Sequence, residues 1–197
     1  MTLQSSGVIT FADIQTEFGG SNPIGFDEYY SGGAYVPPFT YGFGAFPVPS
    51  SGTLNIADFY GTTKNVSITL PSLTMLIQAT TASPNIAYAE FNINPNGRAY
   101  AVTSIYNSSN TTSTEITQWC SPTQAAPGFE VKVSNATNTL NGSAIDEWLP
   151  LTSIRSWYIS DNSLNSPICS FTVEIRRRGT TTAALATGSV DLEATQV

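Results

Sequence analysis

Hydrophobic and polar residues alternate along most of the chain after residue 65, which is the pattern of half-buried β-strands. Three segments alternate with little interruption: 129–133, 169–175 and 190–194. Turn residues are frequent and helical periodicity is scarce. Residues 66–197 are therefore predicted to form an all-β domain, an antiparallel, immunoglobulin-like β-sandwich of about nine short strands.

One connection in this domain has a specific turn signal. Pro95, Asn96 and Gly97 separate AYAEFNI from RAYAVTSI. Asn-Gly dipeptides readily adopt the backbone conformations of tight turns between antiparallel strands. The two runs are predicted to form a hairpin.

The first 62 residues follow a different pattern, because a short unit is written twice. SGVITFADI at 6–14 returns as SGTLNIADF at 51–59. Each copy predicts a turn, a brief strand and then a turn or a single helical turn. Asp13 and Asp58 hold matching places and are predicted to cap nearby backbone amides. Neither copy can bury much surface alone, so residues 1–62 are predicted to be a small, loop-rich docking segment.

An uncharged insert, residues 32–49, lies between the two copies. Its prolines and glycines exclude a helix and a long strand, which leaves an ordered loop or a loose hairpin. The insert holds five aromatic residues: Tyr35, Phe39, Tyr41, Phe43 and Phe46. They either fill a local core or form an adhesive surface that needs a partner. We favour the partner surface and predict these five residues as the interface.

Charge and composition narrow the classes of partner. Only 11% of the residues are charged and the net charge is −7, so nucleic acid is not an expected partner. The one basic cluster, 176–178, ends an apolar strand and is predicted to protect a sheet edge, with a salt bridge to an acidic neighbouring subunit as the alternative. No apolar run is long enough for a membrane span, and synthesis in a cytoplasm is expected. Cys120 and Cys169 lie in apolar runs and are predicted to be free, buried thiols.

The residues offer little for catalysis. The chain has no histidine, which removes the commonest general base and most zinc geometries. The neighbouring carboxylates Asp27-Glu28 and Asp146-Glu147 point apart in an extended chain, so they are interpreted as solvated turn residues. No catalytic residue, metal site or cofactor is predicted.

The tryptophans allow two interpretations. Trp119, Trp148 and Trp157 are core anchors in the first. In the second, Trp148 and Trp157 form a stacking platform for a host surface glycan. The core interpretation is favoured, and the glycan contact is kept as the alternative.

Two segments resemble a known family. SGVITFADIQTEFGGSNPIGFDEYYSGGAYVP and SGTLNIADFYG resemble the amino-terminal segment of minor structural and tail-fibre proteins of tailed bacteriophages, over most of residues 6–61. The second segment, 119–194, is similar to a β domain of the same kind of proteins, through motifs such as FTVEIR and ALATGSVDLEA.

The resemblance implies a non-enzymatic virion protein of the tail, baseplate or fibre that is made in the bacterial cytoplasm. Since no long shaft separates the two segments, an adaptor or short spike is expected. The alternatives are a capsid decoration protein and a glycan-binding receptor module. The expected partners are other virion proteins and further copies of the chain, for example in a trimer.

Overall fold

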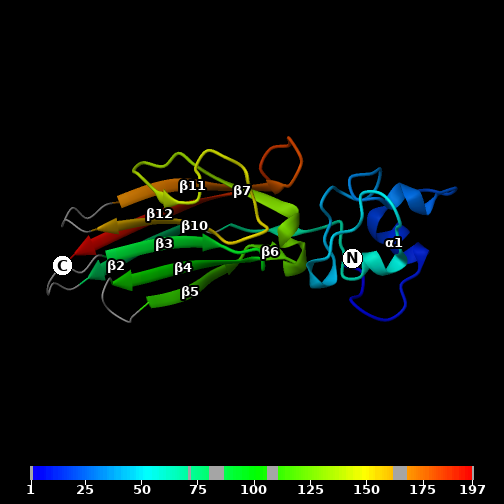
Figure 1. Cartoon of the computed structure of the whole chain (residues 1–197), viewed down its shortest axis with the longest axis horizontal. Helices are drawn as coiled ribbons and strands as arrows, with labels where there is room; N and C mark the ends of the chain where they lie inside the picture. Colours follow the sequence, from blue (N-terminus) through cyan, green and yellow to red (C-terminus); the bar gives the residue numbers. More distant parts are fainter. Residues whose placement is uncertain (1, 71, 80–86, 106–110, 162–167, 197) are drawn as a thin grey trace.

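The computed structural model describes residues 2–70, 72–79, 87–105, 111–161 and 168–196. The molecule is elongated, with a small N-terminal unit (residues 2–62) at one end and the C-terminus at the other (Figure 1). Between them lies a larger two-sheet body (residues 66–196). Strands dominate the described residues, which confirms the predicted all-β character of the chain in general terms.

The N-terminal unit contains short helices joined by loops. They are α1 (Phe11–Phe18) and the 3-10 helices η1 (Phe26–Tyr29), η2 (Phe43–Ala45) and η3 (Ile56–Phe59). In the two repeat copies a helical turn forms, whereas the predicted brief strands do not. The residues before each helical turn, 8–10 and 53–55, pair with no other strand among the described residues, and a strand without a partner leaves its backbone groups unpaired.

A carboxylate caps three of these helices in the same way. In each, the carboxylate accepts a hydrogen bond from the backbone N–H of the N-cap residue, three positions earlier. The N–H of Thr10 donates to Asp13 (2.8 Å), that of Gly25 to Glu28 (2.8 Å) and that of Asn55 to Asp58 (2.7 Å). The capping role predicted for Asp13 and Asp58 is confirmed. Because the repeat preserves this acid, both copies begin their helical turn at the same place.

The two-sheet body contains the strands and one 3-10 helix. The strands are β1 (Ser67–Ile68), β2 (Leu73–Ala79), β3 (Ala87–Ile93), β4 (Arg98–Ile105), β5 (Thr111–Gln118), β6 (Cys120–Ser121), β7 (Phe129–Ser134), β8 (Asn141–Gly142), β9 (Leu149–Pro150), β10 (Arg155–Asp161), β11 (Ile168–Arg177) and β12 (Ala186–Gln196). The helix η4 (Thr123–Gly128) precedes β7. The predicted hairpin at Pro95-Asn96-Gly97 is confirmed, since β3 and β4 pair antiparallel around it.

The strands form two five-stranded sheets in the orders β5-β4-β3-β10-β8 and β2-β12-β11-β7-β9, and β1 pairs separately with β6. The prediction of a purely antiparallel domain is wrong at one place, because β2 pairs with β12 in parallel. Both strands run away from the N-terminal unit (Figure 1). Alternation within a strand reveals its buried face but not its partner, so the sequence pattern could not show this pairing.

The two sheets enclose one hydrophobic core. Phe91 on β3 and Phe171 on β11 meet across it with ring centroids 6.2 Å apart, and Trp157 on β10 stacks on Phe91 at 6.4 Å. The alternating residues of β7 and β11 point inward as predicted, with Val131 and Val173 buried. A second, separate cluster of buried residues lies in the N-terminal unit: Ile9, Ile14, Phe18, Tyr29, Val36, Val48 and Phe59.

Candidate docking site

The five aromatic residues of the insert do not form one surface. They lie in three different environments: the local core, the junction with the two-sheet body, and the exposed surface. Tyr35 belongs to the N-terminal unit, where its half-buried ring lies 5.4 Å from that of Tyr29. Tyr29 is fully buried and its hydroxyl donates to the Gly19 carbonyl oxygen at 2.7 Å. Tyr35 therefore packs against the local core, and it contributes little free surface to a partner.

Phe39 and Tyr41 lie at the junction between the N-terminal unit and the two-sheet body. The guanidinium of Arg178 lies 4.4 Å from the centroid of the Phe39 ring. A Cβ added at Gly128 would lie 2.3 Å from the Phe39 carbonyl oxygen and 3.5 Å from the Tyr41 ring. Only glycine allows so close an approach, so these two aromatic residues join the two parts of the chain.

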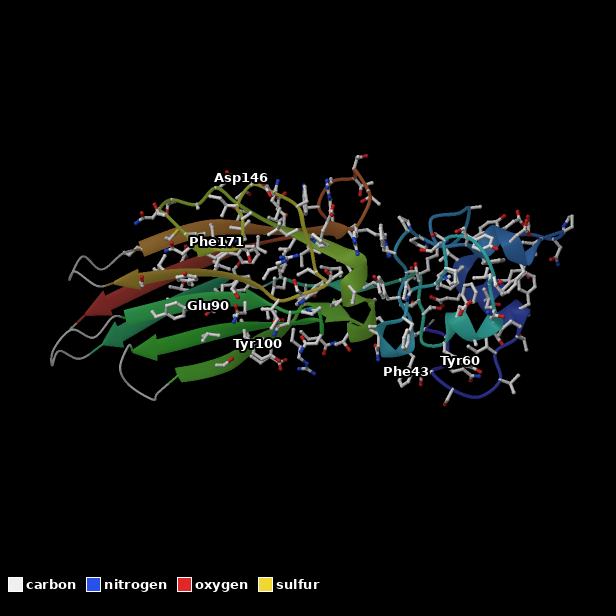
Figure 2. The ribbon with its side chains drawn as sticks, in the orientation of Figure 1. Phe43, Tyr60, Glu90, Tyr100, Asp146 and Phe171 are labelled. Carbon is white, nitrogen blue, oxygen red and sulfur yellow. The ribbon has the colours of Figure 1, made fainter. Side chains whose placement is uncertain are left out.

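Phe43 and Phe46 are the two most exposed of the five insert aromatics. Their exposed fractions are 56% and 75%. They line a surface hollow of about 310 Å³ together with Ser5, Gly42, Pro47, Ala57, Asp58 and Tyr60. Figure 2 shows Phe43 at the edge of the N-terminal unit that faces the two-sheet body, with Tyr60 farther into the unit. Large exposed aromatic side chains beside a hollow are a feature of surfaces that bind a partner.

The backbone holds Phe43 and Phe46 in place. The Phe43 N–H donates to the Tyr60 carbonyl oxygen at 2.7 Å, and the Gly42 N–H donates to the Phe46 carbonyl oxygen at 2.9 Å. An isolated antiparallel bridge also joins Tyr41 to Pro47. The predicted ordered loop or loose hairpin is thus confirmed, and the two rings are presented on a defined turn.

The charge of the N-terminal unit has one sign. Residues 1–62 contain five acidic side chains and no basic one. Asp58 lines the same hollow as Phe43 and Phe46. A partner with positive charge around an apolar contact would complement this surface, whereas two copies of the same face would repel each other.

Glu17 attaches helix α1 to the connection between the two parts. Its carboxylate accepts hydrogen bonds from the Thr63 hydroxyl at 2.7 Å and from the Lys64 backbone N–H at 2.8 Å. Burial alone would raise the pKa of Glu17, but its hydrogen bonds outweigh burial and lower the pKa. The carboxylate therefore stays ionised and keeps the helix fixed against the connecting segment.

The predicted glycan contact is wrong for Trp157. For Trp148 it stays a prediction, and two basic side chains already lie over its ring. Trp157 is fully buried and its indole N–H donates to the Ala144 carbonyl oxygen at 3.2 Å, so its ring has no face free for a sugar. Trp119 is also fully buried. Trp148 is half-buried on the outside of the second sheet, where the Arg176 guanidinium lies 4.0 Å and the Lys132 ammonium 5.1 Å from its ring centroid.

The basic cluster 176–178 does not protect a sheet edge, contrary to the prediction. Strand β11 lies between β12 and β7, and each arginine has its own partner. Arg176 pairs with Glu130 (Nε to Oε1, 2.5 Å), Arg177 lies 5.1 Å from the Phe129 ring centroid, and Arg178 stacks on Phe39. Because strand order is set by tertiary pairing, a charge run at a strand end could not reveal whether the strand lay at an edge.

The described residues contain no cluster of three or more His, Cys, Asp or Glu side chains suited to a metal ion. Cys120 and Cys169 are free and buried, as predicted. Burial raises the pKa of the Cys120 thiol to about 12, with a smaller opposing effect from Arg177, so the thiol is not a nucleophile at neutral pH. Within the described part of the chain, no helix has the length and apolar character needed to cross a membrane.

No family model, curated protein or solved structure matches this chain. Sequence reasoning found Phe43 and Phe46 through the aromatic density of the insert. It missed the other lining residues, apart from Asp58, which it had predicted only as a cap: Ser5, Gly42, Pro47, Ala57 and Tyr60. The hollow forms where the insert, the second repeat copy and the start of the chain meet, although Tyr60 lies in the SGTLNIADFYG motif.

Proposed function

We propose that this protein is a non-enzymatic structural component of a bacteriophage virion, an adaptor or short spike of the tail or baseplate that docks through its N-terminal unit. The observation that supports this function best is the exposure of Phe43 and Phe46 beside a hollow. Three of the five insert aromatics have intramolecular contacts, so these two remain for a partner. The resemblance of residues 6–61 to virion proteins supports the same assignment.

Apolar burial would drive the docking. Fully burying a phenylalanine side chain stabilises a complex by about 1.5–3 kcal/mol, and both rings are already partly covered. Association itself costs at least about 4 kcal/mol in lost freedom of motion. Two rings are therefore too few, and the partner must also cover neighbouring surface. A partner with basic residues would gain from the acidic N-terminal unit.

The two-sheet body would be the part that the docked unit carries. We propose that it is an immunoglobulin-like sandwich. Two observations support this: the sheet order β12-β11-β7-β9 corresponds to the order G-F-C-C′ of variable-type immunoglobulin domains, and the early strand β2 adds beside β12 at the edge of that sheet. A rigid body of this kind can project from a particle or pack against other copies of the chain.

The decisive experiment is incorporation of a Phe43→Ser/Phe46→Ser double variant into phage particles. Deletion of residues 32–49 is less informative, because it would also remove the buried residues Val36 and Val48. We expect the double variant to fold, as judged by circular dichroism, and to be depleted from purified particles at least tenfold. A Phe43→Leu/Phe46→Leu variant keeps most of the apolar surface and is the matched control.

Normal incorporation of the folded serine variant would refute docking through these rings. Labelled antibodies on intact particles would then separate the remaining possibilities. Label on the tail or baseplate fits the adaptor, label over the head fits a capsid decoration protein, and a protein absent from particles contradicts the virion assignment. Sedimentation of the purified protein would show whether it forms a trimer or another closed homo-oligomer.

A further inference from the structure

The outward face of the first sheet has a group of aromatic and polar side chains that is not involved in the core or in docking. On β3 and β10 the inward positions are buried apolar residues, among them Phe91 and Trp157. The alternate positions point outward. We call these outward residues, with one from β4, the tyrosine face: Tyr88, Glu90, Asn92, Tyr100, Ser156 and Tyr158.

We propose that the tyrosine face binds a neutral carbohydrate chain. This inference does not depend on the docking function, because the face lies on the two-sheet body and Phe43 and Phe46 lie in the N-terminal unit. Figure 2 shows Glu90 and Tyr100 on the neighbouring strands β3 and β4. The argument concerns the geometry of the face, its hydrogen-bonding groups and its charge.

Strand register brings the members of the face together. Tyr158 lies opposite Glu90, and Asn92 lies between Ser156 on one side and Tyr100 on the other. The Tyr88 and Tyr158 rings are 5.0 Å apart at an angle of 35°. With strands about 4.8 Å apart, Tyr100 and the Tyr158 ring are separated by about 10–12 Å. Two ring positions at that separation match the length of a disaccharide.

Some hydrogen bonds within the face are already made, and they fix its side chains. The Tyr88 hydroxyl donates to one Glu90 carboxylate oxygen at 2.5 Å, and the Ser156 hydroxyl donates to the side-chain oxygen Oδ1 of Asn92 at 2.5 Å. Burial, together with Glu90, raises the pKa of Tyr88, so this hydroxyl keeps its proton. Side chains held in this way lose little freedom when a ligand binds.

Other groups of the face have no partner among the described residues. They are the Tyr100 and Tyr158 hydroxyls, the side-chain nitrogen Nδ2 of Asn92 and the second carboxylate oxygen of Glu90. The set contains donors and acceptors in close proximity. Each sugar hydroxyl both donates and accepts, and the apolar faces of sugar rings pack on aromatic rings, so a carbohydrate complements both features of the face.

Charge selects among carbohydrates. Beside the face, Arg98 and Glu115 form an ion pair with each other. Among the described outward residues of β3, β4 and β10, Arg98 is the one cation, and its charge is balanced by Glu115 on β5, so Glu90 leaves the face with a net negative charge. A neutral chain therefore fits, and an anionic polysaccharide would meet repulsion from Glu90.

A protein partner suits the face less well. Protein interfaces have an apolar, desolvated centre, whereas the centre of this face is the Glu90–Asn92 pair of polar side chains. The neighbouring strand β4 places one aliphatic residue, Val102, opposite Glu90 on this face. The surface thus provides rings and hydrogen bonds but little aliphatic area.

The test is direct binding of the full chain to a defined panel of probes. The panel comprises neutral hexasaccharides of glucose, galactose, mannose and N-acetylglucosamine in several linkages, together with oligogalacturonate as the anionic probe. We expect at least one neutral probe to bind and oligogalacturonate not to bind. Tyr100→Ala and Tyr158→Ala should each weaken binding at least tenfold. Tyr100→Phe, which keeps the ring, should weaken it by about two- to tenfold, because it removes a single hydroxyl.

Trp148→Phe, on the outside of the opposite sheet, is the matched control and should leave the affinity unchanged. Circular dichroism and thermal unfolding would check that every variant folds. The proposal is overturned if no neutral probe binds, or if binding survives both alanine substitutions in folded protein. It is also overturned if the tyrosine variants lose self-association of the chain and bind no sugar, because the face would then be a protein interface.

Discussion

The N-terminal unit and the two-sheet body are stabilised in different ways. Among the residues that the structure describes, seven buried hydrophobic residues form the cluster in the N-terminal unit and twenty form the cluster between the sheets. The smaller cluster is centred on rings, with Phe59 within 6.5 Å of Phe18, Phe26 and Tyr29. The larger is formed by alternating residues on registered strands.

This difference shows how a short segment can keep a defined shape with little regular structure. In the N-terminal unit, capping carboxylates accept hydrogen bonds from backbone N–H groups three residues earlier, and tyrosine hydroxyls donate to backbone carbonyls farther along the chain. The Tyr29 hydroxyl bonds to the carbonyl of Gly19, and the Tyr60 hydroxyl bonds to that of Gly7. In the two-sheet body, the strands satisfy one another. A unit with so small a core has less stability to lose, and the two parts are expected to unfold separately.

The largest effect is expected from Trp157→Ala in the core of the two-sheet body. The substitution removes a fully buried ring that stacks on Phe91, and it leaves a cavity. We expect the free energy of unfolding of this part to fall by about 3–5 kcal/mol. Urea denaturation followed by tryptophan fluorescence would measure the loss. A change below about 1 kcal/mol would contradict the core role of Trp157.

The next effect is expected from Phe59→Ala and should be confined to the N-terminal unit. We expect a loss of about 3 kcal/mol, because three aromatic neighbours lose their contact. All the tryptophans lie at 119 or beyond, so tryptophan fluorescence reports on the two-sheet body. Limited proteolysis of residues 2–62 should accelerate while the fluorescence midpoint stays unchanged. Equal shifts in both measurements would mean that the two parts unfold as one.

The free energy of unfolding of the two-sheet body should depend on pH through the buried thiol of Cys120. The unfolded thiol of Cys120 ionises near pH 9.0, whereas burial raises its pKa in the folded protein to about 12. The contribution of the buried thiol is therefore complete below pH 9 and is lost as the pH rises toward 12, by about 1.4 kcal/mol at pH 10. The fluorescence-detected unfolding free energy should show this loss, and Cys120→Ala should remove it. An identical pH profile in both proteins would refute the assignment.

The smallest effect is expected from Trp148→Ala, on the outside of the same body. The substitution removes the ring that covers Arg176 and Lys132, which pair with Glu130 and Glu174. We expect a loss of about 1 kcal/mol. Because the two ion pairs become more exposed to water, salt should weaken the variant more than the native chain. Thermal unfolding at low and high ionic strength would test both effects, with Trp148→Phe as the control.

Much of the fold was predictable where the cause is local. Alternation identified the buried positions of β7 and β11, the Asn96-Gly97 turn identified the β3–β4 hairpin, and the repeat identified the capping acids. Each of these signals acts within a few residues of chain. The aromatic density of the insert likewise marked the region that contains Phe43 and Phe46.

The sequence by itself thus determined which residues are buried in strands, where the chain turns and where its adhesive residues are concentrated. Only the tertiary structure decided that β2 pairs in parallel with β12, that the arginines 176–178 lie on a central strand, and which insert aromatics remain exposed. The physical reason is that burial follows from a residue's own polarity and spacing, whereas partners and exposure depend on segments far away in the chain.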